Sequence, residues 1–197
     1  MAGEKDKTVS LVLGSGGARG LAHIGGIHVL EERGYKITSI AGCSVGALIG
    51  GIYAAGKLRE YEDWVRNVTR LDMVSMMDIA WVGGGLVKGD RIINKMIKLV
   101  GSRLIEDLPI RFTAVATELE SGREVWLSEG PLFDAIRSSC SLPLFFTPAR
   151  YREKMLVDGG VVNPVPIAPV FDDHTDLTIA VNLGGKPQKE TYSNGGK

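Results

Sequence analysis

The sequence predicts an α/β protein: a three-layer α/β/α sandwich with a mostly parallel central sheet. Short apolar runs typical of buried strands alternate with segments whose apolar residues recur at helical spacing. Apolar residues make up 44% of the 197-residue chain, which is enough for a single domain with a real core. The 26 glycines are clustered rather than spread, which indicates tight turns and close backbone approaches instead of a flexible linker.

The amino-terminal part begins with a strand, a glycine-rich turn and a helix. The run "TVSLVL" at residues 8–13 is typical of a buried strand, and residues 14–20 form the turn. Apolar residues at helical spacing predict a helix over 21–32, with Gly34 as its carboxyl-terminal stop. A second strand is expected over 36–41.

The middle of the chain is mainly helical. Small residues predict a helix over 45–55 that packs close to the sheet, and six apolar residues between Leu58 and Leu71 mark an amphipathic helix. Residues 72–89, rich in Met and Gly, fit no element. Residues 91–100 are again predicted to be helical.

The remaining elements return to the sheet. Strands are expected over 111–117 and 123–127 around the Ser121-Gly122 turn, and a helix over 132–139. Two last strands are predicted at 155–157 and 177–183. Residues 8–184 thus form one domain, with residues 1–7 as a solvated tail and 185–197 as a second tail or the point at which a longer chain is cut.

Charge and cysteine content exclude several classes of protein. Lys+Arg and Asp+Glu both number 23, so the basic excess of a nucleic-acid-binding protein is missing. A zero sum does not exclude a local membrane-facing patch. Cys43 and Cys140 lack metal-ligand spacing and form no disulfide framework, which fits a reducing compartment. No secretory leader or membrane-spanning run is visible, so we expect a cytoplasmic protein, in at most peripheral contact with a membrane.

The stretch "IAGCSVGALIG" at residues 40–50 predicts a nucleophile elbow, in which a serine projects from a sharp strand-to-helix turn. Gly42 and Gly46 flank Ser44 with the small residues that such a turn requires. By itself the pattern also fits a glycine-lined turn whose serine caps a helix. The neighbouring Cys43 is interpreted as a small buried residue that points toward the sheet.

The loop "GSGGARG" at residues 14–20 is not a dinucleotide-binding loop. The third glycine of G-x-G-x-x-G would fall on Arg19, and the lysine of a phosphate-binding loop is missing. Its backbone N–H groups at a helix start instead suit an oxyanion hole, with Gly16 and Gly17 as donors. Arg19 would hold the loop, assist with a lipid phosphate, or be an ordinary surface residue.

The base that would activate Ser44 has two candidates. His174, in "FDDHTD", gives the chain order Ser44, Asp158, His174 of an ordinary α/β-hydrolase triad. Asp158, in "MLVDGGVVNPVP", lies at a strand end before Gly159 and Gly160 and could be the base itself, although aspartate before two glycines is also a common turn. His23 and His28 lie on the first predicted helix and are expected to have packing or surface roles.

Three motifs in this order make the chain similar to the patatin-like phospholipase family, over about residues 8–184. That family carries a G-G-G-x-R-G oxyanion motif, matched by residues 15–20 with Ser15 in place of the first glycine. It also carries a G-x-S-x-G elbow, matched at 42–46, and a D-G-[GA] motif, matched at 158–160.

The resemblance implies a lipid acyl-ester hydrolase that uses a Ser44–Asp158 dyad, an oxyanion hole at Gly16 and Gly17, and no metal or organic cofactor. The implied partner is an acyl lipid or fatty-acyl ester. Alternatives are a Ser-Asp-His esterase using His174, and a non-catalytic regulatory protein on the same fold. Met73–Met77 and Trp81–Gly85 are read either as an apolar lip for an acyl chain or as a plain helix and loop.

Overall fold

The computed structural model describes residues 7–69, 90–143 and 146–185. Residues 72–89, which include the predicted apolar lip, lie outside this part of the chain. So do nearly all residues of the two predicted tails. Among the described residues, no helix combines the length and apolarity needed to cross a bilayer.

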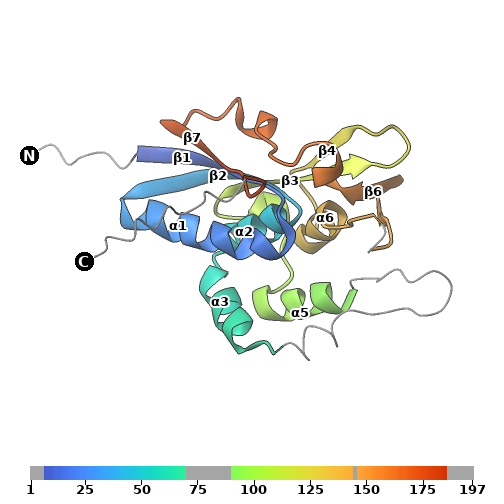
Figure 1. Ribbon diagram of the computed structural model, residues 1–197, viewed down its shortest axis with the longest axis horizontal. Coiled ribbons are helices and arrows are strands. Elements are labelled where there is room, and N and C mark those ends of the chain that lie inside the picture. The colour runs from blue at the N-terminus through green and yellow to red at the C-terminus, as the bar shows by residue number, and fades with distance from the viewer. Residues whose placement is uncertain (1–6, 70–89, 144–145, 186–197) are drawn as a thin grey trace, which may run out of the picture.

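A seven-stranded mixed sheet forms the centre of the molecule (Figure 1). Its order is β5-β6-β3-β2-β1-β7, and β4 pairs with β3. Four neighbouring strands are parallel, whereas β4, β5 and β6 run antiparallel to their partners. The strands are β1 (Lys7–Leu13), β2 (Tyr35–Cys43), β3 (Arg111–Glu118), β4 (Glu124–Leu127), β5 (Ala149–Tyr151), β6 (Lys154–Asp158) and β7 (Leu177–Val181).

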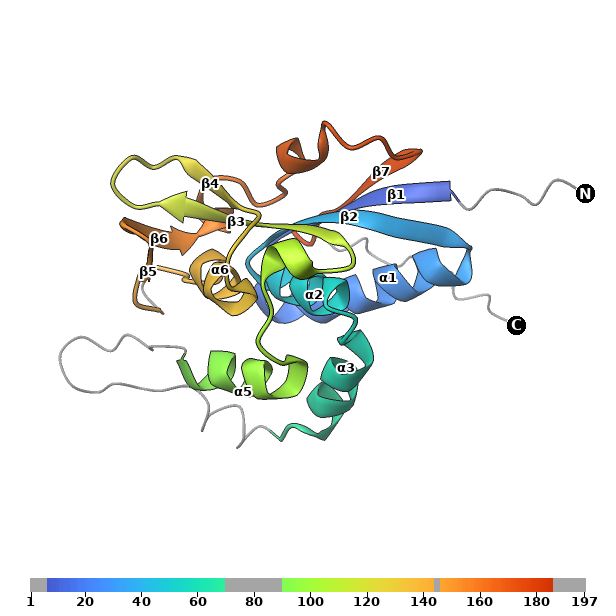
Figure 2. The ribbon, with the colours of Figure 1, turned by 180° about the vertical axis from the view of Figure 1, so that it is seen from behind.

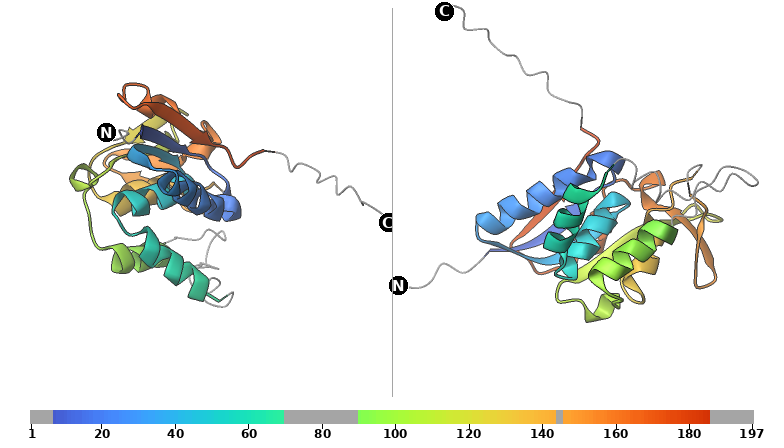
Figure 3. Two further views of the ribbon diagram at one scale, coloured as in Figure 1. Left: turned by 90° about the vertical axis from the view of Figure 1, so that its left-hand side faces the viewer. Right: turned by 90° about the horizontal axis from the view of Figure 1, so that it is seen from below.

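Helices cover both faces of the sheet, but unequally. The α-helices of the described residues all lie on one side of the sheet, as the two views of Figure 3 show. They are α1 (Ala22–Glu32), α2 (Val45–Ala54), α3 (Leu58–Asn67), α5 (Asp90–Val100) and α6 (Leu132–Ser139). The opposite face carries the short 3-10 helix η4 (Ala168–Val170), seen beside β7 and above β2 in Figure 2. The predicted mixed, mostly parallel α/β architecture is therefore confirmed, with one thick and one thin helical layer.

The alternation of residues along β1 divides the core between these two layers. Val9, Leu11 and Leu13 belong to the main apolar cluster beneath the α-helices. Val12 points the other way and packs with Ala41, Val165 and Val170 under η4. Successive strand residues face opposite sides of a sheet, so a continuous apolar run is what a strand covered on both faces requires.

Most predicted elements are present with small changes of boundary. The first helix is preceded by a 3-10 helix, η1 (Gly17–Leu21), because the glycine loop tightens before the α-helix begins. The last strand ends at Val181, two residues before the predicted end. The strand β5 was missed, since its three residues are too few to show an alternating pattern. The structure also adds η2 (Ile105–Asp107) and η3 (Gly159–Val161).

Candidate active site

Ser44 lies on a strained turn between β2 and α2. Its φ of 56° and ψ of −125° are unusual for a residue with a side chain, and such a backbone costs about 1–3 kcal/mol. The turn is very tight: a Cβ atom on Gly46 would lie 2.0 Å from the Leu13 carbonyl oxygen, and one on Gly42 would lie 2.5 Å from that of Gly46. The two flanking glycines are therefore needed for the backbone to pass, as expected for a nucleophile elbow.

The carboxylate of Asp158 meets the hydroxyl of Ser44 although 114 residues separate them. Asp158 ends β6, opposite Ala116 of β3, and the adjacent Val115 is paired with Cys43 of β2. This register brings the carboxyl-terminal ends of β2 and β6 together, and Ser44 Oγ donates a hydrogen bond of 2.6 Å to Asp158 Oδ2. The predicted serine and aspartate are thus in direct contact. Asp158 is only 2% exposed, whereas Ser44 is half-buried.

The surroundings of Asp158 raise its basicity. Burial raises the pKa of this carboxyl above its ordinary value, and hydrogen bonds from Ser44, the Gly160 N–H and the Cys43 thiol offset part of the rise. The Gly160 N–H donates to Oδ1 over 2.7 Å. The charged form is held in place by these donors while burial makes protonation easier than for an aspartate in water.

Gly159 lets the chain turn immediately after the carboxylate. A Cβ atom there would lie 2.2 Å from the Val115 carbonyl oxygen, so only glycine fits against β3. The D-G-G motif therefore meets two separate requirements: close backbone approach at Gly159 and a backbone hydrogen-bond donor at Gly160.

The carboxyl-terminal end of α6 holds the backbones of both residues. Ser139 Oγ accepts a 2.9 Å hydrogen bond from the Ser44 N–H and donates a 2.6 Å bond to the Val115 carbonyl. The thiol of Cys140 donates to the Ser44 carbonyl over 3.1 Å. The Ser141 carbonyl accepts from the Asp158 N–H over 2.9 Å.

The sequence analysis missed this segment. The available signal was the run "SSCS" at residues 138–141, four small residues at the end of an amphipathic helix. Thr117 was missed as well; its hydroxyl donates to the Asp158 carbonyl over 3.2 Å.

Cys43 is fully buried, as predicted, and its Sγ lies 3.9 Å from Asp158 Oδ1. Burial, followed by the nearby Asp158 carboxylate, raises the pKa of its thiol strongly. The pKa of the Cys140 thiol is also raised by burial. Both sulfurs are therefore held as neutral thiols, and neither resembles an activated nucleophile.

The glycine loop begins on fixed supports beside the elbow. The Gly14 N–H donates to the Val181 carbonyl and the Ser15 N–H donates to that of Pro164. His23 is fully buried, and its Nε2 donates to the Gly14 carbonyl over 2.7 Å. Burial lowers the pKa of His23, so its ring is neutral and has a structural role, as expected from its position.

The next two residues of the loop leave their backbone donors unused. Among residues 7–69, 90–143 and 146–185, the structure gives no acceptor for the N–H groups of Gly16 and Gly17. Gly17 is exposed and has a φ of 55°. The loop touches the elbow directly, because a Cβ atom on Gly20 would lie 2.0 Å from Val45 Cγ2.

Ser15 and Arg19 lie on either side of these two glycines. A Cβ atom on Gly160 would lie 2.9 Å from Ser15 Oγ and 3.0 Å from Asp158 Oδ1, so the Ser15 hydroxyl lies close to the aspartate. Arg19 is exposed, and its backbone N–H closes the 3-10 turn onto the Gly16 carbonyl.

His174 lies at the opposite edge of the sheet from Ser44. Its neighbours Asp173 and Thr175 both bond to Ser10 Oγ in the middle of β1, and the next residue, Asp176, bonds to Thr8 near the beginning of that strand. The elbow contacts Leu13 at the end of the strand. Ser10 and Leu13 are three residue steps apart along the strand, which is about 10 Å. The exposed His174 is therefore not brought to Ser44 or Asp158.

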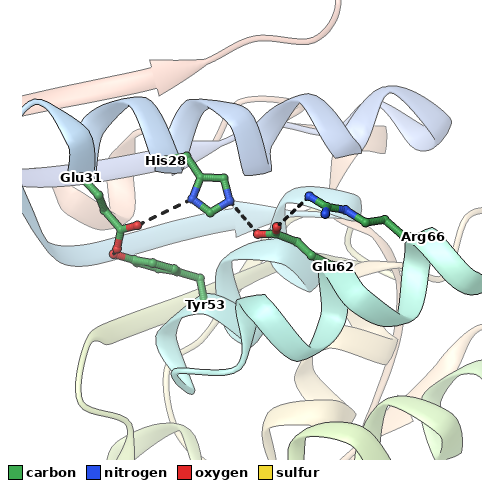
Figure 4. A network of polar contacts seen from close by, with 5 residues as sticks. All are labelled: His28, Glu31, Tyr53, Glu62 and Arg66. Carbon is green, nitrogen blue, oxygen red and sulfur yellow. Dashed lines mark hydrogen bonds and ion pairs between the residues drawn. The ribbon is translucent and has the colours of Figure 1, made fainter.

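His28 is also remote from the elbow turn. It lies in a network of polar side chains between α1, α2 and α3 (Figure 4), where its Nε2 is 2.6 Å from Glu62 Oε1. In the same network, Tyr53 donates to Glu31. This surface role agrees with the prediction.

A serine on a strained turn in contact with a buried carboxylate, beside a glycine loop at the end of a mixed sheet, defines an elbow-type site of the α/β class. The sequence profile described as patatin-like phospholipase matches residues 11–171. The chain therefore belongs to the patatin-like phospholipase family.

Individual relatives agree with this assignment. An uncharacterised NTE family protein of Mycobacterium bovis is 44% identical over 183 residues, which cover 93% of this chain and 51% of the relative. Lysophospholipase NTE1 of Saccharomyces cerevisiae is 28% identical over 186 residues, 90% of this chain and 11% of the relative. The chain thus spans about half the length of the mycobacterial protein and a small part of the yeast one.

The crystal structure of VipD from Legionella pneumophila shares the fold. It superposes with a TM-score of 0.62 at 17% identity, over 80% of this chain and 46% of that one.

Proposed function

We propose that this protein is a lipid acyl-ester hydrolase that uses Ser44 as nucleophile and Asp158 as base. The observation that carries the proposal is the 2.6 Å hydrogen bond from the strained Ser44 to a buried aspartate with a raised pKa. Family membership and relatives named lysophospholipase support an ester of a fatty acid as the substrate.

In the proposed reaction, Ser44 Oγ attacks the ester carbonyl carbon and gives its proton to Asp158 Oδ2. The carbonyl oxygen becomes an oxyanion that accepts hydrogen bonds from the Gly16 and Gly17 N–H groups, at the positive end of the helical segment η1–α1. The tetrahedral intermediate collapses, the C–O bond to the leaving alcohol breaks, and Asp158 returns the proton to that oxygen. Water then repeats the sequence on the acyl-enzyme, with Asp158 as base again, and releases the fatty acid.

A buried aspartate suits this task better than one in water. An aspartate with a pKa near its ordinary value of about 4 is a weak base at neutral pH. Burial raises the pKa of Asp158, and the short contact with Ser44 means that the proton moves over a small distance. Preorganised oxyanion donors add to this, since removing one such donor typically costs about 100- to 1000-fold in kcat.

The triad alternative receives no support from the geometry, because His174 is at the other edge of the sheet. The regulatory alternative predicts a serine that does not react. Labelling with a fluorophosphonate probe separates the alternatives: wild-type protein should gain one adduct by intact mass, and Ser44→Ala should gain none. Labelling of both proteins to the same extent would refute Ser44 as the nucleophile, and no labelling of either would favour a binding role.

The substrate class has its own test, the dependence of kcat/KM on acyl chain length in a series of aryl esters. Each buried methylene contributes up to about 0.8 kcal/mol, so kcat/KM should rise over the first several carbons. A flat or falling series from acetate upward would argue against a lipid.

A further inference from the structure

Three segments surround the site at the carboxyl edge of the sheet, and they are almost free of charge. They are residues 14–27 (glycine loop, η1 and the start of α1), residues 138–143 (end of α6) and residues 159–171 (η3 to η4). Together they contain one charged residue, Arg19, whereas charged residues make up 23% of the chain. His23 does not change this count, because burial lowers its pKa and keeps its ring neutral.

The three segments are neighbours in space. The Ser141 carbonyl bonds to the Asp158 N–H, which links the end of α6 to the start of η3. Gly160 faces Ser15 closely enough that a Cβ atom would lie 2.9 Å from its hydroxyl, which links η3 to the glycine loop.

Each segment exposes large apolar side chains to solvent. Leu21, Leu142, Val161 and Val162 are between 43% and 55% exposed. Leu21 follows the glycine loop, Leu142 follows the end of α6, and Val161 and Val162 follow Asp158, each within a few residues. We call these four side chains the apolar rim.

We infer that the apolar rim is a docking surface for a phospholipid bilayer, which it contacts so that an acyl ester can reach Ser44. This inference rests on the proposed function, because the rim surrounds the residues that would cleave the ester. A bilayer fits better than a water-soluble partner, because placing charged groups among lipid acyl chains is costly and none of the three segments contains an anionic residue. The nearest carboxylate, that of Glu124, is hydrogen-bonded to Asn163. Its single cation, Arg19, is exposed and complementary to a lipid phosphate.

The test measures binding without catalysis. Ser44→Ala protein is sedimented with phosphatidylcholine vesicles, and its partition coefficient is compared with that of the same protein carrying Val161→Glu or Leu142→Glu. Each rim substitution should lower the partition coefficient at least about tenfold, because it removes apolar contact and adds a charge at the interface.

The matched control is Val29→Glu. Val29 is 45% exposed and lies on α1 about two turns away from the rim, so this substitution should change vesicle binding less than twofold. Val161→Ser and Leu142→Ser, with thermal midpoints within a few degrees of the parent, provide milder variants that should give intermediate losses.

Three results would overturn the inference: no vesicle binding by Ser44→Ala, equal loss with Val29→Glu, or a dimer in gel filtration that the rim substitutions dissociate, since the rim would then bind a second copy. Hydrolysis of a soluble short-chain aryl ester by wild-type protein is measured separately. If the ester is hydrolysed but vesicles do not bind, the docking surface is wrong and the function stands. If vesicles bind but no ester is cleaved, the docking surface stands and the proposed hydrolase function is wrong.

Discussion

The two edges of the parallel sheet differ in chemistry although the same four strands make both. At the carboxyl edge, the three segments around the site (residues 14–27, 138–143 and 159–171) contain one charged residue and are organised around Ser44 and Asp158. The charged turn between β3 and β4 borders them. At the amino edge, charged side chains hold the loops: Arg111 Nη1 lies 2.8 Å from Asp173 Oδ1, and Thr8 bonds to Asp176. Asp158 lies at the carboxyl edge and His174 at the amino edge, although sequence order alone would allow both in one catalytic triad.

The position of the candidate site follows from strand direction. In open sheets with parallel strands, sites lie at the carboxyl ends, where backbone carbonyls end and helix N-termini begin. The turn at Ser44 and the loop at Gly16 are both of this kind, whereas His174 lies on the return path toward the start of β7. Substituting matched residues at the two edges and comparing the effects therefore tests the proposed mechanism.

The largest expected effect comes from the two candidate bases. Asp158→Asn should lower kcat by about three to six orders of magnitude, as expected for loss of a catalytic base. His174→Ala should keep kcat within about threefold, because the exposed ring lies at the other edge. Both are measured with a short-chain aryl ester. A folded but inactive His174→Ala protein would show that both edges take part in catalysis.

Two glycines provide the second comparison. Gly17, with φ of 55°, and Gly34, with φ of 75°, both have open space where a side chain would go, but they lie at opposite edges. A β-branched residue strongly disfavours positive φ. Gly17→Val should therefore displace the oxyanion donors and lower kcat by about 100-fold or more.

Gly34→Val is the control for Gly17→Val. It should cause a similar, modest loss of thermal stability with no loss of kcat, because the turn after α1 does not reach the site. Equal kcat values for the two variants would mean that the glycine loop does not supply the oxyanion donors.

The third comparison lies within one helix. Ser139 and Ser138 are both buried, but Ser139 connects the Ser44 N–H to β3, whereas Ser138 donates back to the Asp134 carbonyl inside α6. Ser139→Ala should lower kcat about 10- to 100-fold with little change in KM, because the nucleophile loses a positioning hydrogen bond but the binding surface stays.

Ser138→Ala should leave both constants nearly unchanged, and Ser139→Thr, which keeps the hydroxyl, should restore part of the kcat lost in Ser139→Ala. If the two alanine variants behaved alike, Ser139 would contribute only to packing.

The smallest expected effect is on stability. Because the pKa of Asp158 is raised on folding, the folded state holds its proton more tightly than the unfolded state. The resulting stabilisation is full below the ordinary pKa of 3.8 and is lost as pH rises through the folded-state pKa.

Relative to Asp158→Asn, which does not titrate, wild-type protein should therefore lose free energy of unfolding as pH rises, by at most about 1.4 kcal/mol per pH unit. Urea unfolding across a pH series measures the difference. Ser44→Ala should widen the pH window, since it removes a hydrogen bond that lowers the pKa of Asp158. If wild-type protein instead gained free energy of unfolding relative to Asp158→Asn as pH rises, the raised pKa of Asp158 would be contradicted.

Most of the strand and helix order, the turn at Ser44 and its flanking glycines could be predicted from the sequence, because these features depend on local requirements. A glycine at 46 follows from a turn that brings backbone atoms within 2.0 Å of where a Cβ would be, and such turns have a recognisable spelling. The alternation in β1 likewise reflects a strand covered on both faces.

The fold brings Asp158, and not His174, into contact with Ser44. Both follow Ser44 in the chain, and sequence order does not reveal which edge of the sheet a loop reaches. The antiparallel pairing of β6 with β3 carries Asp158 to the elbow, while the bonds of Asp173 and Thr175 to Ser10 hold His174 away. The supports at Ser139 and Ser141 were hidden for the same reason: a hydroxyl or carbonyl acts on whatever packing brings to it, and that partner lies far along the chain.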